Sequence, residues 1–183
     1  MELTLNDIKS KLFCADAYKK LLKSFNKTSA DDTVVSIQHL LNSNGIDDTL
    51  WVIYHCIPNR VMDIRNMCAD FAESVLYIFE EQYPNDKRPR QAIEIFRKED
   101  ATQQEMAAAM DAAWATAINA AWDTRDTGNV SDAARAAAWA TRAACADRDA
   151  GDVRAAWATA RYARAAGAAE RQKQKEIILK YFG

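Results

Sequence analysis

Hydrophobic residues recur at steps of three and four along most of the chain, which is the spacing that one face of an α-helix requires. The clearest case covers residues 59–83, where these steps predict a long core helix that stops before Pro84. Shorter amphipathic stretches predict helices over residues 4–13 and 15–26. The pattern therefore predicts an all-α protein.

Residues that favour helix ends divide the rest of the first half. Ser29, or one of the aspartates that follow it, can begin a helix that reaches residue 41, and Gly45 suits the left-handed position after that helix. Asp47 or Asp48 can cap another helix, which extends to residue 56. Pro89 fits the first turn of a further helix.

Alanine dominates the chain beyond residue 100, with 29 alanines among residues 101–169 against six in residues 1–100. Three helices are predicted there, over residues 102–127, from 131 to near 151, and from 152 toward 181. The sequence Ala-Ala-Trp-Ala-Thr occurs three times, with the tryptophans at irregular intervals. Because alanine lets helix axes approach closely, we expect a bundle of helical hairpins in which tryptophan fills the gaps.

The predicted architecture is a single all-α domain over residues 1–183 with about eight helices. An amphipathic half, residues 1–100, packs on an alanine-rich half, residues 101–183. We expect the final helix to dock back onto the rest of the protein through its apolar side chains. These are Ile177, Ile178, Leu179, Tyr181 and Phe182.

The charge balance and the residue inventory exclude several classes of partner. The chain carries 24 basic and 26 acidic residues, so its net charge of -2 gives no positive field for a nucleic acid. The N-terminal residues lack the apolar run of a signal peptide or a membrane span, which predicts a cytoplasmic protein without a membrane contact. The four cysteines have no CxxC spacing and only two histidines accompany them, so we expect free thiols, no metal and no cofactor.

Familiar catalytic motifs are absent from the sequence. The five glycines stand alone, which excludes a glycine-rich phosphate loop, and no HExxH, ExxH or GxSxG motif occurs. His55 and Cys56 are adjacent on a predicted helix and point about 100° apart, so they cannot act together as nucleophile and base. We therefore expect a protein that is not an enzyme.

Tryptophan and arginine share a stripe on each alanine-rich helix, because steps of three, four, seven or eleven residues return to nearly the same face. Three such stripes could line a hollow that accepts a planar anion such as a nucleotide, with indoles on the base and guanidinium groups on the phosphate. The alternative is that tryptophan fills the core and arginine covers the surface. The candidate residues are Trp114, Trp122, Arg125, Asp126, Arg135, Trp139, Arg142, Arg148, Trp157 and Arg161.

Two charged segments at predicted helix ends form a second set of candidates. Asp126 lies in the last turn of its helix, where a carboxylate is disfavoured, so either a nearby arginine compensates it or it binds donors on a partner. Lys87, Arg88 and Arg90 lie at a helix start, where backbone N–H groups already attract anions. This basic turn is a candidate contact for a phosphate or an acidic partner, and the alternative is a solvated turn.

Residues 43–51 and 79–94, together with the Ala/Trp/Arg repeats, resemble a family of alanine-rich proteins in bacteria and phages that are described as immunity proteins. The resemblance extends from about residue 40 to the C-terminus, and residues 79–94 are its most specific part. It implies an all-α protein that protects a cell, or a phage inside it, by binding and neutralising something. It brings no catalytic residues.

The leading expectation is a non-catalytic protein that neutralises a toxin or a defence effector by stoichiometric binding. The alternative is a pocket that sequesters a nucleotide-like signalling molecule through tryptophan and arginine side chains. Self-association into a homo-oligomer is compatible with either.

Overall fold

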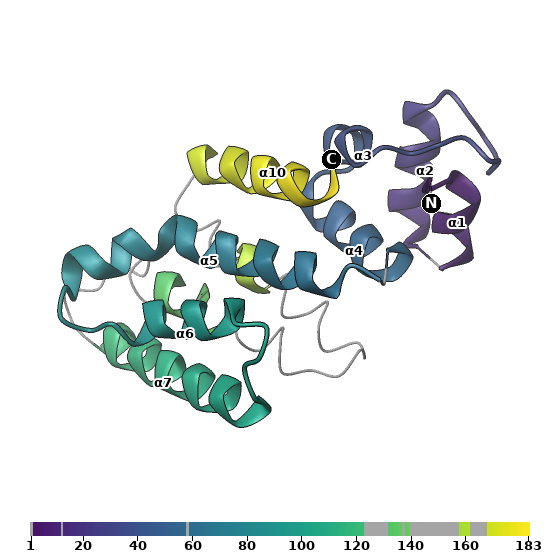
Figure 1. The fold of residues 1–183 in the computed structure, drawn as a ribbon. Coiled ribbons are helices and arrows are strands. Elements are labelled where there is room, and N and C mark those ends of the chain that lie inside the picture. The colour runs from purple at the N-terminus through teal and green to yellow at the C-terminus, as the bar shows by residue number, and fades with distance from the viewer. Residues whose placement is uncertain are drawn as a thin grey trace. The chain divides into compact units, whose positions relative to one another are not determined.

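The computed structural model describes residues 2–11, 13–57, 59–122, 132–136, 138–139, 158–161 and 168–183. Within these ranges every regular element is a helix, apart from one isolated antiparallel bridge between Thr4 and Val34 (Figure 1). The predicted all-α class is therefore confirmed.

The chain divides into two compact units. Unit 1 comprises Met1–Val61 and Ile178–Gly183, and unit 2 comprises Met62–Ile177. The change in composition near residue 100 thus lies inside unit 2. That the whole chain acts as one domain stays a prediction.

Unit 1 begins with helix α1 (Leu5–Ser10), which starts at Thr4 as predicted and ends before residue 13. The Thr4 side chain accepts a hydrogen bond from the Asp7 N–H at 3.2 Å, and the Asp7 carboxylate accepts one from the Thr4 N–H at 2.9 Å. This reciprocal capping box satisfies two backbone donors of the first turn. The hydrogen bonds from Thr4 lower the pKa of Asp7. Helix α2 (Ala15–Ser24) follows.

The predicted start of the next helix is wrong. Helix α3 (Ile37–Ser43) begins at Ser36, whose side chain accepts the His39 N–H at 3.1 Å, and not at Ser29 or the aspartates after it. The Asp31 carboxylate accepts the Thr33 N–H instead, and the Thr33 carbonyl accepts the Leu5 N–H at 3.1 Å. These bonds hold the segment before α3 in an extended form beside the start of α1.

Gly45 precedes helix α4 (Ile46–Cys56) with a positive φ of 95°, as expected for a glycine at this position, but its ψ of -176° is extended and not left-handed helical. The aspartates Asp47 and Asp48 lie in the first turn of α4 and do not cap it, because the helix begins one residue before Asp47. Their carboxylates still face the positive end of the helix dipole.

Apolar residues of helices α1 to α4 form the core of unit 1. The buried members are Leu5, Ile8, Phe13, Leu21, Leu22, Val35, Leu40, Val52 and Cys56. The end of the chain contributes to the same unit, as predicted: Ile178 is fully buried. The Arg60 guanidinium donates to the Tyr181 carbonyl at 2.7 Å and lies 5.2 Å from the centre of the Phe182 ring.

Unit 2 contains all but the first residue of the long helix α5 (Val61–Gln82), predicted from its apolar stripe, followed by α6 (Arg88–Arg97) and α7 (Gln103–Trp122). Pro89 occupies the first turn of α6, as expected. Three aromatic side chains, Phe71, Phe79 and Phe96, are fully buried. Helix α10 (Ala168–Phe182) runs from unit 2 into the last residues of unit 1.

Small side chains fill the contact between α6 and α7. Ala92, Ala113 and Ala138 are completely buried in one cluster, with Ala109 beside them. This cluster confirms that the alanine-rich helices pack through alanine. The predicted helix ends near residues 127 and 151 lie outside the described residues.

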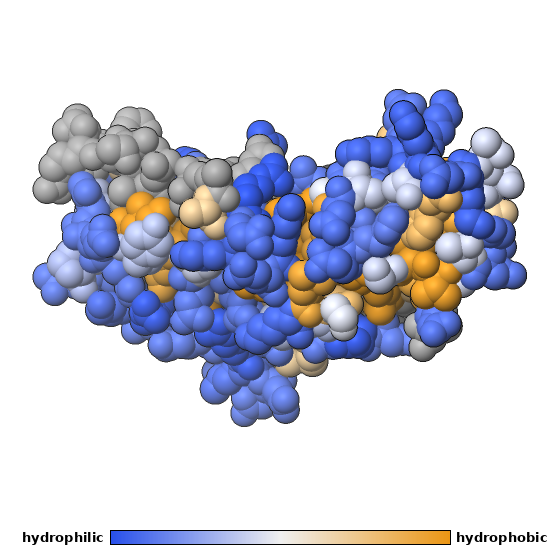
Figure 2. Space-filling view, turned by 90° about the horizontal axis from the view of Figure 1, so that it is seen from above, coloured by the Kyte–Doolittle hydropathy of each residue, from blue (hydrophilic) through white to orange (hydrophobic). Residues whose placement is uncertain are grey.

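The face seen in Figure 2 is mainly hydrophilic, and its hydrophobic residues gather in separate patches. Among the helices of the described residues, none has both the length and the apolar character that a bilayer crossing requires.

Candidate functional site

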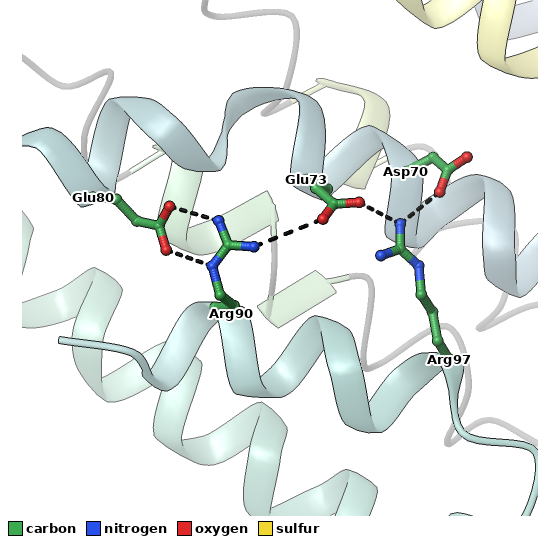
Figure 3. A network of polar contacts seen from close by, with 5 residues as sticks. All are labelled: Asp70, Glu73, Glu80, Arg90 and Arg97. Carbon is green, nitrogen blue, oxygen red and sulfur yellow. Dashed lines mark hydrogen bonds and ion pairs between the residues drawn. The ribbon is translucent and has the colours of Figure 1, made fainter. Parts of the chain in front are cut away.

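Charged side chains connect α5 and α6 in a ladder that Figure 3 shows from close by. Arg90 of α6 donates two parallel hydrogen bonds, both of 2.6 Å, to the Glu80 carboxylate of α5. Its other terminal nitrogen lies 3.8 Å from the Glu73 carboxylate. About two turns further along α6, Arg97 donates a hydrogen bond to Glu73 and another to Asp70, each of 2.6 Å. The ladder fixes the register of α6 on α5.

Two of the three basic residues in the turn at the start of α6 are bound to carboxylates. Arg88 forms a second forked pair with the Asp86 carboxylate, at 2.9 and 2.5 Å. Arg88 and Arg90 thus direct two donors each to carboxylates of the same chain, and Lys87 between the two pairs is exposed. An external anion on this turn would meet Lys87 first.

The segment before that turn forms a shallow, open depression lined by Gln82, Tyr83, Pro84, Asn85 and Asp86. The Tyr83 ring packs against the buried Phe79 ring, with centroids 5.0 Å apart. The Asp86–Arg88 pair closes the turn on its other side. The depression is therefore supported by a buried aromatic ring and an ion pair, which gives the surface a defined shape.

Two of the predicted indoles meet in the alanine-rich part of unit 2. Trp114 of α7 and Trp139 approach edge to face, with ring centroids 5.7 Å apart and an interplanar angle of 71°. Both side chains are partly buried, and Trp114 packs on the buried alanine cluster. Arg135 lies 3.0 Å from the Asp132 carboxylate, and Arg161 is exposed.

Six of the candidate side chains belong to parts of the chain that the structure does not describe. The side chain of Trp122 at the end of α7 lies outside the described residues, as do Arg125, Asp126, Arg142, Arg148 and Trp157. The structure thus brings together Trp114 and Trp139, and it places Lys87, Arg88 and Arg90 on one turn. The three-stripe hollow stays a prediction.

Arg97 was missed at the sequence level, together with the carboxylates that bind the arginines of α6. A signal for them exists: Glu73 and Glu80 are seven residues apart on α5, and Arg90 and Arg97 are seven apart on α6. Seven residues span about two helical turns, so each pair presents two charges on one face. Two such faces with opposite charge favour helices that pack side by side.

The surroundings of His55 and Cys56 favour the neutral form of both side chains. The Cys56 thiol is buried, which raises its pKa to about 11. Burial, assisted by the Lys11 ammonium, lowers the pKa of His55, and its ring lies against Trp51 with centroids 4.2 Å apart. In the described part of the chain no group of three or more His, Cys, Asp or Glu side chains could hold a metal ion.

Thiol reactivity should follow burial. On the native protein at about pH 8, we expect iodoacetamide to label the exposed Cys14, whereas the buried Cys56 and Cys68 react only after unfolding. Mass spectrometry of tryptic peptides identifies the labelled residue in each case. Labelling of native Cys56 at the rate of Cys14 would contradict its buried, protonated state.

The ladder should make unit 2 sensitive to acid. Hydrogen bonds from Arg90 lower the pKa of Glu80, and those from Arg88 lower the pKa of Asp86. Their contribution is therefore complete above the unfolded-state pKa values of 4.5 and 3.8 and is lost as the pH falls through the lower, folded values. We expect the Arg90→Gln protein to be less stable near neutral pH and to lose less stability on acidification.

Urea unfolding followed by circular dichroism between about pH 6 and pH 3 measures this difference. Lys98→Gln, at the opposite end of α6, is the control, because Lys98 is 3.9 Å from Glu105 with both side chains largely exposed. Parallel stability curves for Arg90→Gln and the unmodified protein would show that the ladder contributes nothing to acid sensitivity.

The fold and the site define a class: an all-α protein whose described charged side chains hold its helices together and surround no metal centre. Residues 62–180 match the model of a family described as Imm-5 like putative immunity protein, and the chain belongs to this family. Membership implies toxin neutralisation, with a cognate toxin as partner, in a family that is typically non-catalytic.

The matched range begins at residue 62, where unit 2 begins. The resemblance noted at residues 43–51 therefore lies outside the matched range, whereas residues 79–94 lie within it and form the end of α5, the depression and most of α6. Neither a curated protein nor a solved structure matches the chain.

Proposed function

We propose that this protein neutralises a toxin or a defence effector by forming a stoichiometric complex with it, without a chemical step. Membership in the immunity family, established over unit 2, is the observation that carries the proposal. The burial of the Cys56 thiol and the mutual pairing of charges on α5 and α6 agree with a binding role.

We place one contact of that complex on the turn between α5 and α6. Forked pairs hold Arg88 and Arg90, so the turn keeps its shape in the free protein and little conformational entropy is lost on binding. Pro84, Asn85 and Lys87 are exposed around it. Lys87 then offers a cation to an acidic group of the partner, beside the depression at Gln82–Asp86.

Native mass spectrometry tests the complex. The purified protein is incubated with extract from cells that carry the target, and we expect a new species whose mass is the sum of this chain and one partner. The same spectrum reports self-association. Absence of any such complex would remove the basis of the proposal.

A pair of variants at the two ends of α6 tests the contact. Lys87→Glu reverses the exposed charge before the first turn and should weaken the complex by about tenfold, which corresponds to about 1.4 kcal/mol. Lys98→Glu makes the same charge change after the last turn and should leave the affinity unchanged. Equal effects of the two variants would exclude this turn as the contact.

The contact between Trp114 and Trp139 favours a second candidate, a pocket that sequesters a nucleotide-like molecule. Arg135 and Arg142 would supply guanidinium groups for the phosphate. Calorimetry with a panel of nucleotides should then show binding that Trp139→Ala and Arg142→Ala abolish while the circular dichroism spectrum is retained. Unchanged affinity in both variants would eliminate the pocket, and recovery of an intact ligand distinguishes sequestration from turnover.

A further inference from the structure

Helix α2 of unit 1 has one apolar face and one lysine face. At about 100° per residue, Tyr18, Leu21 and Leu22 fall on the side that packs into the core. Lys19, Lys20 and Lys23 fall within an arc of about 100° on the opposite side, and all three are exposed. We call these three residues the lysine face.

Three carboxylates of unit 1 are engaged away from the lysine face. Asp7 belongs to the capping box, Asp31 binds Lys27 and the Thr33 N–H, and Asp48 accepts a hydrogen bond from Asn44. The acid nearest the lysine face is Asp16, whose contact with Lys19 measures 3.9 Å. Because 78% of the Lys19 side chain and 94% of the Asp16 side chain are exposed, solvent screens this pair.

Lysines of the lysine face thus differ from the arginines of unit 2. Arg88, Arg90 and Arg97 each donate to carboxylates at 2.5 to 2.9 Å. Among the described residues, no carboxylate lies within ion-pair distance of Lys20 or Lys23. Lys19 and Lys23 are also four residues apart, where like charges repel. An external acidic group would relieve this repulsion and meet ammonium groups that are free to bind.

We propose that the lysine face of α2 docks an acidic surface of the protein that this chain neutralises. The inference rests on the proposed function, and it identifies the chemistry of a second contact on that partner. Since the lysine face lies outside the family-matched residues 62–180, it contributes specificity that belongs to this chain and not to the family fold.

The composition of the face favours carboxylates over phosphates. It contains no arginine, whose planar fork matches phosphate best. The aromatic residues of α2 and the segment after it, Tyr18 and Phe25, pack into the core of unit 1 and offer no ring to a nucleobase. A net charge of -2 also gives the chain no general attraction for a nucleic acid or an anionic membrane.

Fluorescence polarisation of labelled poly-L-glutamate with the full chain tests the chemistry of the face. We expect binding at low salt that weakens as salt is added. The triple variant Lys19→Glu, Lys20→Glu, Lys23→Glu should lose affinity by tenfold or more. The triple variant with arginine at the same positions should keep it, because the charge is preserved.

A control variant reverses three other basic residues of unit 2, Lys98, Arg171 and Lys175, none of which belongs to the contact proposed at Lys87. It makes the same change in net charge and should bind poly-L-glutamate nearly as tightly as the unmodified protein. Circular dichroism and thermal unfolding verify that each variant is folded. Equal losses in the two reversed variants would overturn the proposal, because binding would then follow net charge and not the lysine face.

Two further probes separate the sources of anionic charge. An oligouridylate and vesicles that contain phosphatidylserine should bind more weakly than poly-L-glutamate, and tighter binding of either to the lysine face would overturn the assignment to an acidic protein. Failure of this proposal can be distinguished from failure of the proposed function. If native mass spectrometry still shows the complex after the lysine face is reversed, the docking role of the face is rejected and the proposed function is retained.

Discussion

Replacing Phe96 by alanine should lower the free energy of unfolding by about 3 to 5 kcal/mol, because the ring is completely buried in unit 2. The side chain also supports a polar contact. The Arg65 guanidinium lies 5.3 Å from the centre of the ring and donates to the Phe96 carbonyl at 2.8 Å. Loss of the ring leaves a cavity and removes one surface against which Arg65 packs. Urea unfolding followed by circular dichroism measures the change.

Tyr77→Ala is the control for that experiment. Tyr77 lies on α5 and is also aromatic, but 51% of it is exposed, so its truncation should cost less than about 1 kcal/mol. A loss for Phe96→Ala as small as that for Tyr77→Ala would contradict the buried position of α6 in unit 2.

Enlarging Ala113 to leucine should lower the free energy of unfolding by about 1 to 3 kcal/mol, because three added carbons must fit between helices that approach through alanine. Ala113 is fully buried, with Ala92 of α6 and Ala138 in the same cluster. The buried members of that cluster are all alanines, which have no rotatable side chain that could make room, and Ile95 and Trp114 pack against them. The helices themselves must separate, which also disturbs the nearby Trp114.

Ala115→Leu offers a matched control on the same helix. Ala115 is exposed, and leucine is nearly as good a helix former as alanine, so we expect a change within about 0.5 kcal/mol. Thermal unfolding of the two variants in parallel gives the comparison. If Ala113→Leu were as stable as Ala115→Leu, the alanine cluster would not be close-packed.

Local signals predicted most of the helices. The apolar stripe of α5, the positive φ at Gly45 and the proline in the first turn of α6 depend on residues that are close in sequence. The start of α3 depends on a distant partner, because the Thr33 carbonyl accepts a hydrogen bond from Leu5. A capping residue such as Ser29 carries no information about that contact, so local reasoning placed the helix start too early.

For the candidate site, too, the sequence predicted local features but not the contacts that depend on packing. Trp114 and Trp139 occupy the same position of the Ala-Ala-Trp-Ala-Thr repeat, and their rings are in edge-to-face contact. The hollow predicted from three such stripes stays a prediction. Sequence also placed Arg88 and Arg90 on one turn. It gave their charge but not their partners, because the Glu80 carboxylate that receives Arg90 lies on another helix and reaches it only through packing.

The division of the chain into units bears on how the protein is made. Unit 1 takes its last six residues, Ile178–Gly183, from beyond unit 2, so the ribosome finishes all of unit 2 before unit 1 has every residue it needs. Nascent domains generally fold as units in the order in which they are completed. The buried members of the core that α1 to α4 form all precede residue 57, so that core can form early, whereas the contact of Arg60 with Tyr181 and Phe182 forms only after all of unit 2 has been synthesised.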